Sequence, residues 1–452
     1  MTVRSAVTAF TRTLLRVFFR RVEVAGLFRF PKDGPAIVVL NHPNGLVDPA
    51  VLLCLSPRPV SFVAKAPLFD MPVVGFLTRA IDSIPVWRRE DDGAASEKTR
   101  KTFSSSCALL RNGGVLGLFP EGTTHDDTRM KPLKTGTARI ALAAASGLAG
   151  SGEPVRIVPA GLLFTDKSAF RSSVLLVFGE PFVVEPPEVS ERGTPPPALV
   201  RALTDRVREA IDEVTLQADR DEALALAAWV EELLDPPRGD GEEASLEREL
   251  GLRRRLLRAY ANLKEARPKE ISRLATRVVR YESLASALGV YYPKALDPDR
   301  MTPVGIAWNT GKTALLALLL APAALLGFLV HFPAYTAAGI VANRYARGDK
   351  SLLATTKMLG SLIFFPVTWI VAGALAGTRL GWAGALAAIA LLPASGWAAL
   401  LLSERFERSW AALRALGLLL FKKRLYLRLV AERRAIREAI VRIAEETKLP
   451  NW

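Results

Sequence analysis

Residues 37–49 read Ile-Val-Val-Leu-Asn-His-Pro-Asn-Gly-Leu-Val-Asp-Pro, and this stretch decides the fold of the chain. Its four leading apolar residues predict a buried strand that ends at Asn41. The proline, asparagine and glycine after His42 are residue types that turn a chain sharply. An imidazole at a strand end and the Asp48 carboxylate across that turn can form one hydrogen-bonded pair, suited to general-base catalysis. Taken alone, the stretch is explained more simply by a histidine that serves only the turn.

Residues 116–126, Leu-Gly-Leu-Phe-Pro-Glu-Gly-Thr-Thr-His-Asp, form a second apolar strand that runs into a polar turn. A lone Pro-Glu-Gly is an ordinary strand exit and is weak evidence by itself. Together, the two stretches resemble the first and third sequence blocks of the glycerolipid acyltransferase superfamily, whose bacterial type is the lysophosphatidate acyltransferase. Further stretches look like the second block, the region after the third block, and the fourth block: 62–65, 75–77 and 84–88, then 134–139, then 155–161. Five blocks in the family order make the resemblance specific.

The turn between His42 and Asp48 departs from the common family pattern. That pattern has four residues between the histidine and the aspartate, which would place the acid at Val47. Here residues 43–47 intervene, so Asp48 is the candidate. The eukaryotic-type glycerol-3-phosphate acyltransferases resemble this chain in that spacing and in the His125-Asp126 pair after Pro-Glu-Gly. This resemblance favours glycerol-3-phosphate as the acceptor.

The resemblance implies a membrane-bound O-acyltransferase of phospholipid biosynthesis. His42 would deprotonate a glycerol hydroxyl, and Asp48 would orient and polarise the imidazole. The hydroxyl would attack the thioester of acyl-CoA or acyl carrier protein directly, with glycerol-3-phosphate or lysophosphatidate (1-acyl-glycerol-3-phosphate) as acceptor. No acyl-enzyme, cofactor or metal is implied. Two alternatives stay open: a transacylase that remodels lysophospholipids, and a non-catalytic lipid-binding membrane protein.

The same resemblance implies a set of residues that position the substrate: Arg88, Glu121, Gly122, Thr123 and Lys134. A guanidinium fork binds phosphate oxygens through two donors and keeps its charge at any working pH, which suits Arg88 to the glycerol phosphate. Without the resemblance, Arg88 fits a solvated surface arginine. Lys134 is equally well explained as an exposed residue near a helix start.

Composition narrows the class of partner. Lys and Arg outnumber Asp and Glu by 60 to 45, giving a net charge of +15, which suits nucleic acid, an anionic membrane or acidic substrates. The sequence has neither zinc-finger spacing nor a basic strand interleaved with aromatics, so no nucleic acid is expected. Three histidines are too few for most metal clusters. Cys54 and Cys107, both in apolar surroundings, indicate a reducing compartment without disulfides.

Residues 22–185 carry the pattern of an α/β domain, with a mixed sheet flanked by helices. The expected strands are short apolar runs: 22–25, 36–40, 60–64, 84–87, 115–119, 155–164 and 174–178. Helical patterns occur at 48–56, 96–111 and 134–147. Residues 1–21 predict an amphipathic helix that lies on a membrane surface, with packing on its own domain as the alternative because the same apolar stripe serves either partner. Its members are Val3, Val7, Phe10, Leu14 and Phe18.

Residues 186–300 predict a proline-rich linker and a charged helical region, with helices at 199–234, 246–266 and 270–288. The uncharged runs 313–343, 358–378 and 380–403 are long enough to cross a bilayer core, so residues 301–403 predict transmembrane hairpins. Residues 404–452 are basic and predict an amphipathic tail on a membrane surface.

The charge pattern predicts the membrane topology. Basic residues in the loop 344–357 and in the tail favour the cytoplasmic side. The run 313–343 exceeds the core thickness and contains Pro322 and the His331-Phe332-Pro333 sequence, which predicts a hairpin or re-entrant pair. The runs on either side of Arg379 predict a second hairpin. The catalytic domain, the loop and the tail would then all face the cytoplasm.

Overall fold

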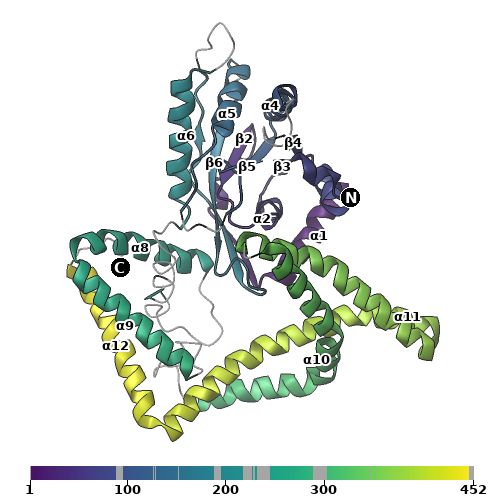
Figure 1. The fold of residues 1–452 in the computed structure, drawn as a ribbon, viewed down its shortest axis with the longest axis vertical. Coiled ribbons are helices and arrows are strands. Elements are labelled where there is room, and N and C mark those ends of the chain that lie inside the picture. The colour runs from purple at the N-terminus through teal and green to yellow at the C-terminus, as the bar shows by residue number, and fades with distance from the viewer. Residues whose placement is uncertain are drawn as a thin grey trace. The chain divides into compact units, whose positions relative to one another are not determined.

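The computed structural model describes residues 2–87, 95–125, 127, 129–150, 152–187, 195–216, 227, 230–231, 245–288, 303–347 and 349–446. The chain divides into two compact units, whose elements are labelled in Figure 1. The sheet unit comprises residues 1–217, 245–250 and 345–358. The helical unit comprises residues 218–244, 251–344 and 359–452.

One mixed sheet organises the sheet unit. Its strands are β1 (Arg21–Ala25), β2 (Ala36–Leu40), β3 (Val60–Lys65), β4 (Ile84–Val86), β5 (Val115–Leu118), β6 (Arg156–Phe164), β7 (Ser173–Phe178) and β8 (Phe182–Val183). The strand order is β1-β7-β6-β2-β5-β3-β4, and β8 pairs with β6. β6 is antiparallel to β7 and β8, and the other strand pairs are parallel. All seven expected strands are present, and the predicted α/β class with a mixed sheet is confirmed.

Helices cover both faces of this sheet. They are α1 (Val3–Phe18), α2 (Val47–Leu55), α3 (Pro72–Ala80), α4 (Ala95–Arg111), α5 (Gly136–Gly147) and α6 (Pro197–Asp212), with short 3-10 helices η1 (Leu27–Arg29) and η2 (Ala66–Asp70). In Figure 1, α1 and α2 lie on one side of the sheet, and α5 and α6 lie on the other. The α6 helix packs on the core through residues such as Val200 and Val207, so the compact unit continues beyond the boundary expected at residue 185.

The central strand β2 is buried on both faces, and every one of its residues is fully inaccessible to solvent. Val38 and Leu40 join the core with α1 and α2, whereas Ile37 and Val39 join the core with α4, α5 and α6. Side chains alternate across a strand, so a strand with helices on both faces is apolar at every position. This burial explains why residues 37–40 show no polar alternation.

The N-terminal helix α1 packs on its own domain, which was one of the two expected alternatives. Val7, Leu15 and Phe18 are buried in the core shared with α2. Two arginines also bond to the domain, since Arg4 Nη2 donates to the Val60 carbonyl and Arg12 Nη2 donates to the Cys54 carbonyl. Other apolar members of the helix, such as Val3 and Phe10, remain exposed.

The helical unit is built from long helices: α8 (Leu246–Ala266), α9 (Pro268–Ala287), α10 (Pro303–Ala346), α11 (Lys350–Phe421) and α12 (Lys423–Glu446). The tail helix α12 lies alongside α9, where Arg277 pairs with Glu432 at 2.5 Å and Ile443 packs beside Ile271. Part of the apolar face of the tail is therefore covered by protein, while Leu427 stays exposed.

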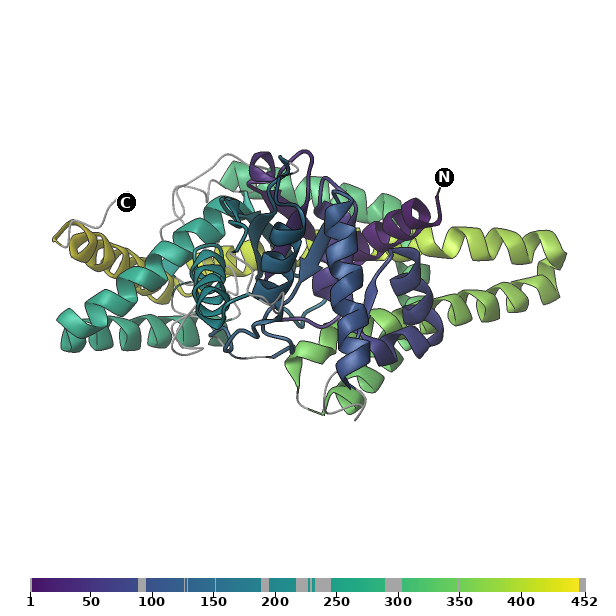
Figure 2. The same ribbon diagram turned by 90° about the horizontal axis from the view of Figure 1, so that it is seen from above.

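The expected break within residues 313–343 is absent, because α10 is one helix with Pro322 and Pro333 inside it. A proline removes one backbone hydrogen bond and kinks a helix without always ending it, and α10 changes direction along its length (Figure 1). The helix α11, in contrast, reverses at Gly381, whose φ of 70° and ψ of −175° are non-helical. Its two arms lie side by side (Figures 1 and 2), with Gly373 packed against Ile389.

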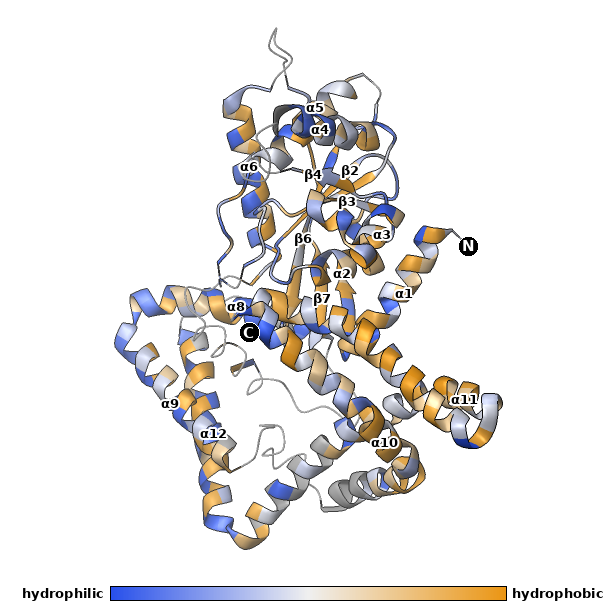
Figure 3. Cartoon of the chain, turned by 45° about the vertical axis from the view of Figure 1, so that its right-hand side comes forward, coloured by the Kyte–Doolittle hydropathy of each residue, from blue (hydrophilic) through white to orange (hydrophobic). Residues whose placement is uncertain are grey.

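Two helical stretches are long and apolar enough to cross a membrane: 311–346 in α10 and 351–406 in α11. Both are mostly hydrophobic along their length (Figure 3), and many of their large apolar side chains, such as Leu318 and Ile370, are exposed. Exposed leucine and isoleucine at this density are unusual on a surface that faces only water.

Candidate active site

His42 and Asp48 meet at the carboxyl end of β2, as the sequence predicted. His42 Nδ1 lies 2.8 Å from Asp48 Oδ2, and the same oxygen accepts the Asn44 amide hydrogen at 2.7 Å. Gly45 has a φ of 45°, the left-handed region that glycine enters without a steric penalty. This tight turn places Asp48 in the first turn of α2, where the helix dipole favours a negative charge.

The two side chains differ in exposure. Asp48 is completely buried, and burial raises the pKa of its carboxyl above the ordinary value of 3.8, although the hydrogen bond from His42 acts in the opposite direction. His42 keeps 18% of its side-chain surface exposed. Since Nδ1 is engaged by Asp48, Nε2 is the nitrogen available for proton transfer, and it has no hydrogen-bond partner within the described part of the chain.

Two residues of the third block hold His42 in place. The Phe119 ring stacks on the imidazole, with ring centroids 4.1 Å apart and planes 23° from parallel. Glu121 Oε1 accepts the His42 backbone N–H at 3.1 Å. The β2 and β5 strands are paired in parallel, so the two blocks emerge side by side at the same sheet edge.

Glu121 is nearly inaccessible and its carboxylate is fully engaged by protein groups. Besides His42, it accepts the Lys131 backbone N–H at 2.8 Å and pairs with His125 Nε2. The other His125 nitrogen faces Asp127 at 3.6 Å. Through these contacts, Glu121 links His42 of the first block to the third block.

The remaining residues predicted to position substrate are placed as follows. Gly122 turns the chain with a φ of 69°, and the Lys134 side chain lies over it, within 3.3 Å of where a Cβ would stand. Lys134 is exposed, and Thr123 is partly buried. Arg88 and Asp126 lie outside the described residues.

Some contacts of the first block, besides that with Glu121, were not predicted from the sequence. One is the stacking of Phe119, and the others involve asparagines of the first block. Asn41 exchanges two hydrogen bonds with the Leu162 backbone, at 3.0 and 2.8 Å, and Asn44 Nδ2 donates to the Lys167 carbonyl at 2.8 Å. Asparagine at a strand end, with side-chain donors and acceptors that need partners, is the signal that points to such bonds.

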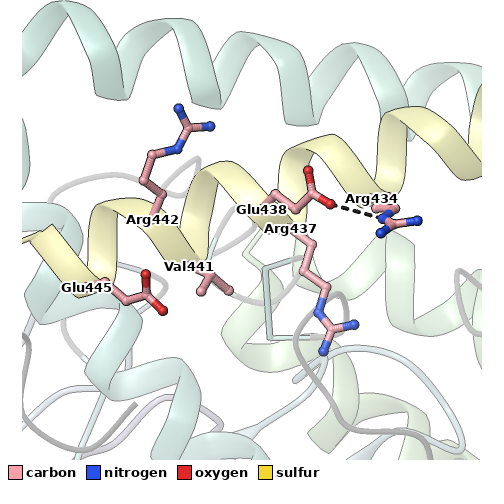
Figure 4. Close-up of a pocket in the computed structure, with 6 residues that line it drawn as sticks. All are labelled: Arg434, Arg437, Glu438, Val441, Arg442 and Glu445. Atoms are coloured by element: carbon pink, nitrogen blue, oxygen red, sulfur yellow. Dashed lines mark hydrogen bonds and ion pairs between the residues drawn. The ribbon is translucent and has the colours of Figure 1, made fainter.

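Other candidate sites are weaker. His331 is bonded through both ring nitrogens, to the Gly327 carbonyl and to Trp369 Nε1–H, which leaves neither for catalysis. No group of three His, Cys, Asp or Glu residues within the described ranges has the arrangement to hold a metal. A hollow along α12 is lined by Arg434, Arg437, Glu438, Val441, Arg442 and Glu445 (Figure 4), and these lining residues include no histidine, cysteine, serine or threonine.

A histidine–aspartate pair at the end of a parallel strand has the geometry of a general base that can activate a hydroxyl. Residues 21–162 match the model of the Acyltransferase family. This match, which covers residues 21–162 alone, confirms the acyltransferase resemblance seen in the sequence blocks.

Three curated relatives extend the match. An uncharacterized acyltransferase of Schizosaccharomyces pombe is 25% identical over 79% of this chain and 66% of its own length. Glycerol-3-phosphate O-acyltransferase 2 of Saccharomyces cerevisiae is 26% identical over 60% of this chain and 37% of its own. The chloroplastic 1-acyl-sn-glycerol-3-phosphate acyltransferase BAT2 of Brassica napus is 31% identical over 33% and 39%. The chain thus spans less than two thirds of the length of each of these relatives.

Proposed function

We propose that this chain transfers a fatty acyl group from acyl-CoA or acyl carrier protein to the hydroxyl of glycerol-3-phosphate, or else of 1-acyl-glycerol-3-phosphate. The observation that carries this proposal is the contact of 2.8 Å between His42 and the buried Asp48, at the edge of an acyltransferase-family domain. The yeast and plant relatives are named for these two acceptors.

The proposed reaction uses His42 as general base and needs no covalent intermediate. Its Nδ1–H donates to Asp48, so the lone pair of Nε2 takes the proton of the glycerol hydroxyl. The hydroxyl oxygen forms a bond to the thioester carbonyl carbon, and the carbon–sulfur bond breaks. The thiolate leaves and receives the proton from the imidazolium. Ionised Asp48 stabilises the imidazolium during the step, as buried acids do in hydrolytic triads.

The acceptor phosphate needs cations near the base. Lys134 lies exposed over Gly122, next to the third block, and Arg88 follows β4 in the sequence. We infer that these two side chains bind the phosphate, whereas Glu121 and Gly122 shape the turn that holds His42. Replacing Arg88 by lysine keeps the charge but loses the bidentate fork, so the KM for the acceptor rises more than the KM for the donor.

We further propose that the chain is membrane-bound, with its catalytic domain on the cytoplasmic face. Residues 245–250 and 345–358 both belong to the sheet unit. Among the described residues between them, only a stretch of α10 is long and apolar enough to span a membrane. A single crossing by α10 would place the two segments on opposite sides of the membrane. We therefore infer that the bent α10 enters and leaves the membrane on one side, and that the reversal at Gly381 returns α12 to that side.

Single cysteines at Arg344 and Arg434, both exposed, test this topology in intact cells with a membrane-impermeant maleimide. The native thiols give a low background because both are buried, and burial raises the pKa of Cys54 to about 11. We expect both positions to be protected until the membrane is opened. Labelling of either from outside contradicts the proposed orientation.

The proposed activity is tested with purified full-length protein and labelled acyl-CoA, offered glycerol-3-phosphate, lysophosphatidate and a lysophospholipid in parallel. We expect acylation of glycerol-3-phosphate with the highest kcat/KM and loss of the product in His42→Ala. Strong preference for lysophosphatidate would assign the second acceptor. Acylation of the lysophospholipid alone, or of none of the three, overturns the proposal.

A further inference from the structure

The catalytic turn is completed by a segment that lies far from it in the sequence. Residues 345–358 cluster with the sheet unit, although α11 continues into the helical unit beyond them. The Leu46 backbone N–H, between His42 and Asp48, donates to Thr355 Oγ1 at 3.0 Å. Thr355 is itself nearly inaccessible to solvent, so this amide has a buried partner from the start of α11.

The segment fits closely against the turn. A Cβ at Gly45 would stand 2.6 Å from Thr355 Oγ1 and 3.5 Å from the Ser351 carbonyl, so only glycine allows this approach. Ser351 and Ala354 are completely buried, and Met358 packs against the same core as α2. Positions 351, 354, 355 and 358 follow the i, i+3, i+4, i+7 spacing of one helix face. Small residues on that face bring the helix backbone close to the turn.

Further bonds anchor the same face. Asp349 Oδ1 accepts the backbone N–H of Ser351 at 2.9 Å and its hydroxyl at 2.6 Å, which is the bonding of a helix N-cap. Lys357 Nζ donates to the Ser168 carbonyl at 2.9 Å. The neighbouring Lys167 carbonyl in turn accepts the Asn44 side-chain amide. The segment therefore holds the catalytic turn directly through Thr355 and indirectly through the loop after β6.

We propose that Thr355 is a positioning residue for the His42–Asp48 pair, and that the start of α11 is a built part of the active site. This inference rests on the proposed acyl transfer. Its chemical basis is the amide of Leu46: with the Thr355 hydroxyl in place, the turn between base and acid is held at both ends and at its middle. Without it, a partly buried amide loses its partner and the separation of His42 from Asp48 is less well fixed.

The test uses three variants of the full chain. Thr355→Val removes the hydroxyl and keeps the shape, and Thr355→Ser restores it. Thr356→Val is the matched control, because the Thr356 hydroxyl donates to the Leu352 carbonyl of its own helix, at 2.8 Å. We expect Thr355→Val to lower kcat by about 5- to 10-fold, the value of one hydrogen bond, with both KM values within about twofold. Thr355→Ser and Thr356→Val are expected to stay within about twofold of the wild type in kcat.

Amide hydrogen exchange gives a readout that does not depend on activity. Peptides that contain Leu46 are expected to exchange faster in Thr355→Val and to be unchanged in Thr356→Val and Thr355→Ser. If Thr355→Val does not fold, Thr355→Ala removes the hydroxyl without the bulk of valine.

Unchanged exchange at Leu46, or faster exchange with unchanged kcat, overturns the positioning role. A wild type that acylates none of the acceptors overturns the proposed function instead, and the exchange comparison still decides whether Thr355 holds the turn.

Discussion

His42 pairs with Asp48 across the turn after β2, whereas His125 pairs with Glu121 within the third block. Both acids are buried, but the histidines are held differently. His42 has one nitrogen on its acid and is partly exposed, while His125 is buried between Glu121 and Asp127. A base needs a nitrogen that a substrate can reach. The comparison therefore shows two histidine–carboxylate pairs in different settings, and only His42 has the accessible nitrogen that the proposed general base requires.

The largest expected effect separates the two histidines. His42→Ala should lower kcat by about 10²–10⁴-fold, the usual contribution of a general base. His125→Gln keeps a donor toward Glu121, so its kcat should stay within about tenfold of the wild type, the scale of one hydrogen bond. Steady-state turnover of the two variants, with circular dichroism to verify folding, measures the difference. A larger loss in His125→Gln would reverse the assignment.

The next largest effect separates the two acids, Asp48 and Glu121. Asp48→Asn leaves no ionised partner for the imidazolium and should lower kcat on the order of 10²-fold. Glu121→Gln replaces one oxygen by an amide and disturbs three contacts of a buried side chain, which should cost about 1–3 kcal/mol of stability with a smaller loss of turnover. Thermal unfolding and turnover, measured on the same preparations, separate these outcomes. If Asp126→Asn proves more damaging to turnover than Asp48→Asn, the base is oriented from the third block.

The smallest effect concerns pH. Burial raises the pKa of Asp48, so the folded protein holds that proton more tightly than the unfolded chain does. The stabilising contribution of this group is therefore fully present below the ordinary carboxyl pKa and is lost as the pH rises through the raised value. Relative to Asp48→Asn, the wild type should lose thermal stability as the pH rises above 3.8. A difference in Tm that grows in favour of the wild type with pH would show that the pKa is lowered instead.

Much of the sheet unit could be predicted from the sequence because its strands are short apolar runs between turn signals. The central strand at 36–40 and the helix at 47–55, expected at 48–56, illustrate this. The meeting of His42 with Asp48 was also predictable, since both residues belong to one turn. Family blocks supplied the reason to treat that turn as catalytic.

The hydrogen bonds that hold the catalytic turn in place could not be predicted, because they join residues that are distant in sequence. Glu121 was expected to contact substrate, yet its bonds to His42 and Lys131 follow from the pairing of β2 with β5. The contact of Thr355 with Leu46 spans more than three hundred residues and leaves no local pattern. From the sequence, the helix is expected to end near Pro322 and Pro333, but a helix can bend at a proline and continue.

A double-mutant comparison of His42 and Asp48 tests the central claim most directly. Residues that act as one catalytic unit show non-additive losses, because removing the base makes its orienting acid irrelevant. We therefore predict that His42→Ala/Asp48→Asn has the same kcat for glycerol-3-phosphate acylation as His42→Ala alone, within about threefold. Losses that multiply, so that the double variant falls below His42→Ala by the full Asp48→Asn factor, would contradict the pairing of these two residues in catalysis.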